Sequence, residues 1–198
     1  MINALLSLHH QSSGPGVDVL SRLVNLAGRQ RMLSQRITLF LTMAANGRPH
    51  ALMVAEEALH LFTQTHKRLV EGDNTLPGLF SPALRDVFEG PTQGRRRIDA
   101  FIGLAQDTAT SIKQGVTLSE MVIDGLMDAA NAVLSLLNLI TQTYEDEVHR
   151  KTSVEHEAHQ QLDAALMAVV STMRSSPDAT QLRQLADQLS EIVRLRQE

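Results

Sequence analysis

The chain of 198 residues contains no cysteine and no tryptophan, and it has only one tyrosine and five phenylalanines. The absence of cysteine excludes disulfides, thiolate metal sites and cysteine nucleophiles. Hydrophobic residues make up 43% of the chain but aromatic residues only 3%, so the core has to be built from aliphatic side chains and methionine. Such residues suit helix-on-helix packing better than a sheet.

Charge and hydropathy exclude further classes of protein. The formal net charge is -4, and the cations are spread among acids, unlike the basic footprint of a nucleic-acid-binding protein. Apolar stretches such as residues 132–140 fall short of the roughly 20 residues that a membrane span needs. Residues 1–10 lack the cation and the cleavage site of a signal peptide. We therefore expect a soluble, cytoplasmic protein with no membrane span and no nucleic-acid partner.

The spacing of the apolar residues predicts an all-α fold whose main helices form an antiparallel four-helix bundle. The first helix should begin with Asp18 as its N-cap and end before Asn46, and the second should run from about residue 50 to 71. Ser81-Pro82 could open one short helix in the loop that follows. The third helix should cover about residues 93–114.

A long fourth helix should begin at a capping box formed by Thr117 and Glu120. Its polar middle, residues 145–159, leaves open whether it is one bent helix or two. After a break at residues 175–178, the spacing predicts a final helix that folds back as a hairpin.

These elements suggest three parts of the chain. We expect a flexible N-terminal arm over residues 1–16, a four-helix bundle over residues 17–150, and a C-terminal helical hairpin over residues 151–198 that extends the same domain.

The most informative segment, residues 25–36 in the first helix, holds three arginines, one glycine and no acid. At about 100° per residue, the side chains of this part of the helix fall on two narrow faces, here called seams, which carry different residues. One seam carries Val24, Gly28, Arg31 and Gln35, and the other carries Arg29, Met32 and Arg36. A helix-interior glycine costs about 1 kcal/mol against alanine, but it permits close approach of a backbone or ligand. Since an arginine fork matches planar oxyanions, two copies crossing at Gly28 could enclose one anion between their Arg31 side chains.

This segment, with its Ala-Gly and Arg-Met pairs and its Ser-Gln-Arg triplet, resembles the signature of the PilJ-like sensor family. That family comprises the N-terminal domains of type IV pilus methyl-accepting transducers and the sensor domains of nitrate/nitrite sensor kinases and chemoreceptors. Helix lengths agree over about residues 17–150. The resemblance implies a dimeric four-helix bundle for signal transduction or chemotaxis, which recognises nitrate or nitrite at a subunit interface in the first helix.

The resemblance also assigns roles to individual residues. It implies that Arg31 grips the anion and that Gly28 allows the close approach, with Val24 and Gln35 beside them on the same seam. Arg36 would be a second important arginine. Because it points away from Arg31, we expect it to hold the bundle or a neighbouring chain.

Other functions stay open. By composition alone, the arginines also fit a solvated helix face. A structural or adaptor bundle could have kept the signature for dimer packing, with residues 152–198 binding a protein partner. A di-iron bundle is suggested by the Glu57-x-x-His60 and Asp146-x-x-His149 spacings, although the first helix offers no acid between Val19 and Asn46. We expect a homodimer that signals to a downstream protein, without enzyme activity, metal or other cofactor.

Overall fold

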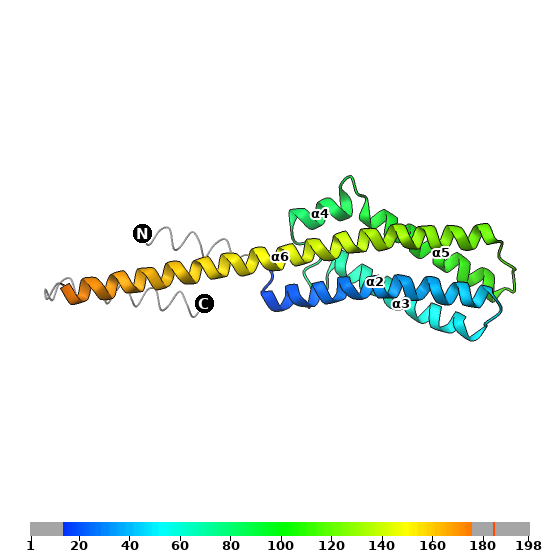
Figure 1. Ribbon diagram of the computed structural model, residues 1–198, viewed down its shortest axis with the longest axis horizontal. Helices are drawn as coiled ribbons and strands as arrows, with labels where there is room; N and C mark the ends of the chain where they lie inside the picture. Colours follow the sequence, from blue (N-terminus) through cyan, green and yellow to red (C-terminus); the bar gives the residue numbers. More distant parts are fainter. Residues whose placement is uncertain (1–13, 176–183, 185–198) are drawn as a thin grey trace. The chain divides into compact units, whose positions relative to one another are not determined.

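The computed structural model describes residues 14–175 and residue 184 (Figure 1). In this part of the chain all regular structure is helical, and no strand is present. The helices are α2 (Val17–Ala45), α3 (His50–Glu71), α4 (Pro82–Glu89), α5 (Gly94–Lys113) and α6 (Glu120–Ser175). The predicted all-α class is therefore confirmed, and the arrangement is that of a helical bundle.

The contacts divide the chain into two compact units. One unit spans Ser13–His149 and contains α2 to α5 together with the first part of α6. The described part of the other unit is the 150–175 segment of α6 and residue 184.

Helix α2 forms because every third or fourth residue is apolar and faces the bundle. Its buried positions include Leu20, Leu23, Ala27, Leu33, Ile37 and Leu41. The helix begins at Val17 after Gly16, not after Asp18 as predicted, and Asp18 instead lies in the first turn, where an acid favours the helix dipole. At the other end, Asn46 follows the last residue, and Gly47 has a φ of 83°, which only glycine adopts without cost.

Helix α3 has the predicted bounds, and its end shows why a glycine is needed there. Gly72 has a φ of 78°, and a Cβ on it would lie 2.7 Å from the carbonyl oxygen of Leu76. The short α4 begins at Pro82, and the Ser81 hydroxyl accepts a hydrogen bond from the Leu84 amide at 3.3 Å. Serine before a helix and proline at its first position are both favoured.

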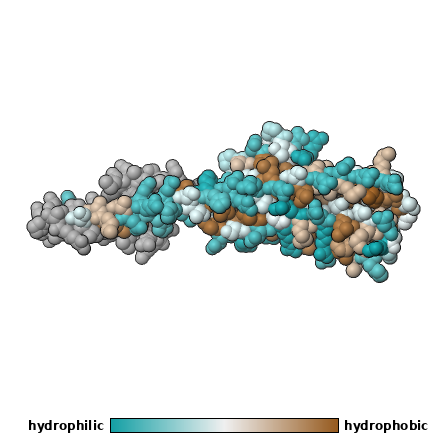
Figure 2. Space-filling view, viewed as in Figure 1, coloured by the Kyte–Doolittle hydropathy of each residue, from teal (hydrophilic) through white to brown (hydrophobic). Residues whose placement is uncertain are grey.

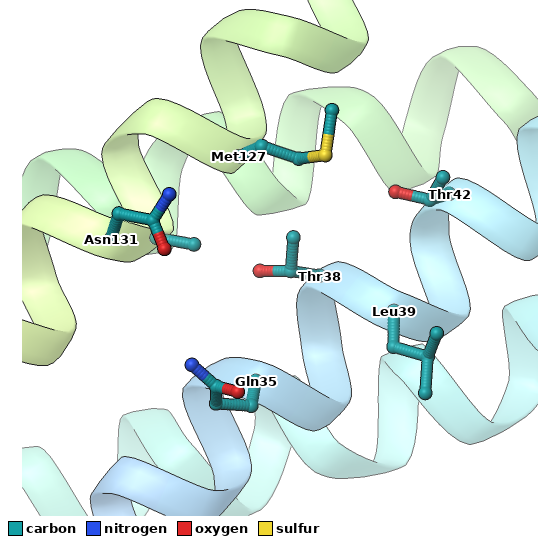
Figure 3. A pocket seen from close by; sticks show the side chains of 7 residues that line it. Gln35, Thr38, Leu39, Thr42, Met127 and Asn131 are labelled. Atoms are coloured by element: carbon teal, nitrogen blue, oxygen red, sulfur yellow. The ribbon is translucent and has the colours of Figure 1, made fainter.

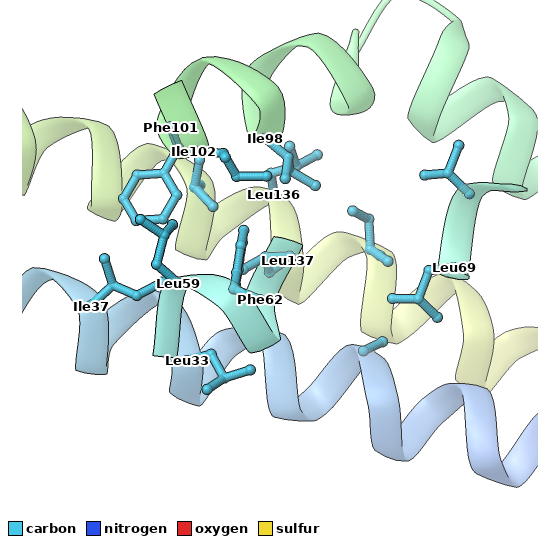
Figure 4. Packing of buried hydrophobic residues seen from close by; sticks show 14 of the residues in the cluster. Leu33, Ile37, Leu59, Phe62, Leu69, Ile98, Phe101, Ile102, Leu136 and Leu137 are labelled. Atoms are coloured by element: carbon cyan, nitrogen blue, oxygen red, sulfur yellow. The ribbon is translucent and has the colours of Figure 1, made fainter. Parts of the chain in front are cut away.

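The core of the first unit consists mainly of aliphatic side chains, with three phenylalanines and one tyrosine among them (Figure 4). Phe62 of α3 and Phe101 of α5 pack edge to face with their ring centroids 5.7 Å apart. Helix α6 covers them with a stripe whose members recur at intervals of four and three residues: Leu126, Ala130, Val133, Leu137, Ile140 and Tyr144. This spacing is the helix–helix packing pattern on which the prediction of a bundle depended.

Helix α6 settles two predictions about the second half of the chain. It begins at Glu120, and the Ser119 carbonyl accepts the first helical hydrogen bonds, so the predicted capping box at Thr117 is wrong. It continues through residues 145–159 without a break, which answers the question of one helix or two. The helix ends at Ser175, and the predicted C-terminal helix that folds back lies outside the described residues.

By length and composition, α6 is also apolar enough to cross a membrane. An 18-residue window within Glu120–Val169 has a mean hydropathy of 1.4, and 33% of that window is buried. The prediction that no segment qualifies considered only uninterrupted apolar stretches, whereas this window includes polar residues. The stripe from Leu126 to Tyr144 already has apolar partners inside the bundle, and core helices of many proteins pass the same test. The window is therefore weak support for a membrane span.

Candidate functional site

The outer face of α2 carries cations without neighbouring acids. Arg29, Arg31 and Arg36 are all exposed, and none of them forms an ion pair with a carboxylate in the described residues. Some other cations of the same unit are paired, as in Arg68 with Asp73 at 2.6 Å. The arginine segment therefore presents positive charge that the described chain does not neutralise.

The four residues of the predicted seam become more exposed from the first to the last over three turns of α2. Val24 is half-buried and packs against the core cluster, Gly28 is half-buried, and Arg31 and Gln35 are exposed. A Cβ on Gly28 would meet no heavy atom within 4 Å. Packing among the residues that the structure describes thus gives no reason for a glycine here, and these residues leave the space above Gly28 open to another molecule.

The second seam is partly apolar. The guanidinium carbon of Arg36 lies 5.4 Å from the ring centroid of Phe40, one turn further along α2, which is the geometry of a cation–π contact. Apolar side chains interrupt the hydrophilic surface of this unit (Figure 2), and α2 contributes Met32 and Leu39, which are 51% and 55% exposed. Arg36 thus contacts its own helix, and apolar groups flank the arginines.

A pocket of about 290 Å³ lies between α2 and α6, one turn beyond Arg31 (Figure 3). Its lining comprises Gln35, Thr38, Leu39 and Thr42 of α2, and Met127, Ala130 and Asn131 of α6. Figure 3 shows the amides of Gln35 and Asn131 on facing helices. The lining carries no charged group, so the pocket adds hydrogen-bonding groups, but no charge, to the end of the predicted seam.

Gln30 is a residue of the arginine segment to which the sequence analysis gave no role. It is only 1% exposed, and its Nε2 donates a 2.9 Å hydrogen bond to the Phe62 carbonyl. This bond ties α2 to α3 immediately before Arg31. The position of Gln30 three residues after buried Ala27 is the signal that could have identified this residue, because that spacing places Gln30 on the core face of α2. The α6 side of the pocket, including Asn131, was also missed.

A second polar cluster lies apart from α2. His66 of α3 is 6% exposed, stacks on Phe88 of α4 with ring centroids 6.2 Å apart, and approaches Asp99 of α5 with Nε2 3.3 Å from the carboxylate oxygen. Burial lowers the pKa of His66, and the Asp99 charge opposes this effect in part. The cluster joins three helices.

The two carboxylate–histidine spacings do not build a metal centre in the described part of the chain. Within it, no three His, Asp or Glu side chains gather closely enough to hold an ion. His60 instead forms a hydrogen bond with Gln64 on the exposed side of α3, with the two Nε2 atoms 2.9 Å apart. The residues present thus do not fit a di-iron group.

A comparison with known families tests the resemblance carried by the arginine segment. Residues 18–115 match the family model of the type IV pili methyl-accepting chemotaxis transducer N-terminal domain, PilJ. Residues 18–115, about half of the chain, are thus similar to the PilJ domain. The match covers almost all of α2 and the whole of α3, α4 and α5, so the resemblance is confirmed well beyond the arginine segment. No curated protein and no solved structure matches the chain.

The PilJ match indicates a role in sensing and signalling, because this family supplies the sensor-type domains of chemotaxis transducers. It ends before α6, which supplies the other wall of the pocket and of the core.

Proposed function

We propose that the bundle senses a small planar oxyanion, nitrate or nitrite first, and that Arg31 from each of two copies holds the anion where two α2 helices meet. One observation carries this proposal: Arg31 is exposed and has no carboxylate partner in the described chain, and it lies one turn from a glycine above which the space is empty.

The chemistry of arginine supports the choice of ligand. Its guanidinium is planar and permanently charged, and it can donate two parallel hydrogen bonds to two oxygens of a planar anion. Open space above Gly28 would let a second helix approach closely enough for both guanidinium groups to reach one small ion. Arg31 and Gln35 supply side-chain donors on successive turns of α2, and Gly28 leaves the surface beside them open.

We further propose that the signal is a displacement of the helices. An anion held between two α2 helices favours one relative position of those helices over another, and it can shift their equilibrium only by its difference in affinity for the two positions. Since Gln30 ties α2 to α3, a shift of α2 would be passed to the rest of the bundle.

Calorimetric titration of the purified protein with nitrate, nitrite and chloride tests the binding. We expect saturable binding of nitrate or nitrite, and Arg31→Ala should weaken it by about 1.5–3 kcal/mol, or roughly 10- to 150-fold in Kd, since hydrogen bonds to charged groups contribute about that much. Arg48→Ala, which removes an exposed arginine beyond the end of α2, is the matched control and should bind as the wild type does.

Nitrate and nitrite binding that survives in Arg31→Ala would contradict the proposal. If no oxyanion binds and the dimer is intact, the adaptor function left open by the sequence is favoured, with residues 152–198 as the partner-binding segment.

A further inference from the structure

We infer that the pocket between α2 and α6 is a second ligand site, separate from Arg31, which takes a small uncharged amide carried on a planar apolar ring. This ligand differs from the oxyanion in charge and in size. Both walls of the pocket belong to one copy of the chain and to one compact unit, Ser13–His149. The site is therefore complete without a second copy.

The pocket presents hydrogen-bonding groups that the described chain does not use. The side-chain amides of Gln35 and Asn131 form no hydrogen bond with another described residue. The Thr38 hydroxyl donates to the Ser34 carbonyl at 3.0 Å, which leaves lone pairs on its oxygen. Figure 3 shows the polar ends of Gln35, Thr38 and Asn131 around the same space. A ligand there would meet both donors and acceptors from two facing helices.

The uncharged lining determines which ligand group fits. None of the described residues around the pocket is ionisable, so an ionised group would lose its hydration there without gaining an ion pair. The nearby Arg36 is engaged with Phe40 on its own helix. A carboxamide is neutral, and its NH₂ and carbonyl oxygen can pair with the same groups of an asparagine or glutamine side chain. The lining therefore favours an amide over an acid or an amine.

The size and the apolar part of the pocket determine the rest of the ligand. The volume is about 290 Å³, whereas a cavity of about 150 Å³ already accepts benzene. Leu39, Met127 and Ala130 supply the apolar contacts, and a methionine sulfur packs favourably at the edge of an aromatic ring. Leu39 and Met127 are 55% and 39% exposed, so a ring would cover apolar surface that is now in water. One ring with one amide group fits in size and polarity.

A ligand held here would contact α2 and α6 together. It would favour the relative position that the two helices have in the structure, and it would stabilise the folded bundle by mass action. Gln35 belongs to both the seam and the pocket, whereas Asn131 belongs to the pocket and not to the seam. Asn131 is therefore the residue that distinguishes this site from the oxyanion site.

Benzamide and benzoate are matched probes, because they share one ring and differ in whether the attached group is neutral or charged. In an NMR titration of the ¹⁵N-labelled full chain, we expect benzamide to bind saturably and to shift the Asn131 side-chain amide resonances. Benzoate should bind at least about 10-fold more weakly, because its charge has no partner in the pocket.

Asn131→Leu keeps the side-chain size and removes the hydrogen-bonding group, so it should weaken benzamide binding about 3- to 10-fold, the usual effect of one lost hydrogen bond. Asn131→Asp, which keeps the shape and adds a charge, should weaken it as well. Asn138→Leu, at an exposed asparagine of α6 outside the pocket lining, is the control and should bind as the wild type does. Arg31→Ala should also leave benzamide binding unchanged.

Three results would overturn the inference: no saturable binding of benzamide, benzamide binding that is unaffected by both Asn131 variants, or benzoate binding as tight as that of benzamide. The last result would indicate an anion site served by the arginines of α2. None of them bears on nitrate binding at Arg31, which the calorimetric titration tests separately.

Discussion

Gly28 and Arg31 are neighbours on the seam of α2, but the reasons for finding each residue type on this helix differ. Arginine is a good helix former and is stable on an exposed face, so its presence alone requires no ligand. Glycine in the middle of a 29-residue helix is unfavourable, and here no atom in the described part of the chain lies close enough to require it. Gly28 is therefore the stronger indication that another molecule approaches α2.

This difference predicts opposite effects of Gly28→Ala on stability and on binding. Alanine should raise the free energy of unfolding by about 0.5–1 kcal/mol in nitrate-free buffer, because it lowers the entropy that the helix loses on folding. The same methyl group should weaken nitrate binding by obstructing the second helix. Urea unfolding and calorimetric titration measure the two effects.

Gly125→Ala in α6 is the matched control, because that helical glycine is exposed and also has empty space around its Cβ position. It should give a similar gain in stability without loss of binding. Nitrate binding by Gly28→Ala as tight as in the wild type would show that close approach at Gly28 is not needed.

At the scale of the helices, His66 is the polar side chain that joins α3 to α4 and α5. It is neutral when buried, because burial lowers its pKa below the ordinary value of 6.5. The unfolded chain therefore takes up the proton first as the pH falls, and protonation favours unfolding. The stabilisation by neutral His66 is complete above about pH 6.5 and is lost below it.

The free energy of unfolding should thus decrease from about pH 6.5 downward, by at most about 1.4 kcal/mol per pH unit from this residue. His66→Gln should be less stable at neutral pH but should show a flatter profile in this range. His60→Gln, on the exposed side of the same helix, is the control. Parallel profiles for His66→Gln and the wild type between pH 5 and 7 would show that His66 does not titrate on unfolding.

How well each helix could be predicted depended on local signals. Helix α3 was predicted with its correct bounds, because its apolar periodicity ends at a glycine that adopts positive φ. The start of α6 was misplaced because Thr117 and Glu120 have capping-box spacing, although the residue that precedes the helix and accepts its first hydrogen bonds is Ser119. The continuity of α6 could not be predicted, since its polar middle satisfies the rules for both a helix and a break.

At the scale of the whole molecule, the buried hydrophobic residues that the structure describes all lie between Leu20 and Tyr144. That range falls within the first unit, Ser13–His149. A fragment of residues 13–149 should therefore fold cooperatively and bind nitrate as the full chain does. Thermal unfolding followed by circular dichroism, together with the nitrate titration, checks this. A fragment without a cooperative transition would mean that the core depends on residues beyond 149.

The candidate site was only half predictable from sequence. The seam on α2 follows from helical geometry, so Val24, Gly28, Arg31 and Gln35 could be grouped in advance. The pocket could not, because Met127 and Asn131 lie about 90 residues away in the sequence and reach Gln35 only through the packing of α6 on α2. Nor does one sequence indicate which surface faces a second copy.

The central claim is that Arg31 binds the anion, and side-chain NMR of arginine-labelled protein tests it most directly. In a nitrate titration at constant ionic strength, the Arg31 Nε–H resonance should shift saturably, with the same Kd as the calorimetric titration, while that of Arg48 stays in place. An Arg31 resonance that does not move, or that moves no more than Arg48, would contradict the account.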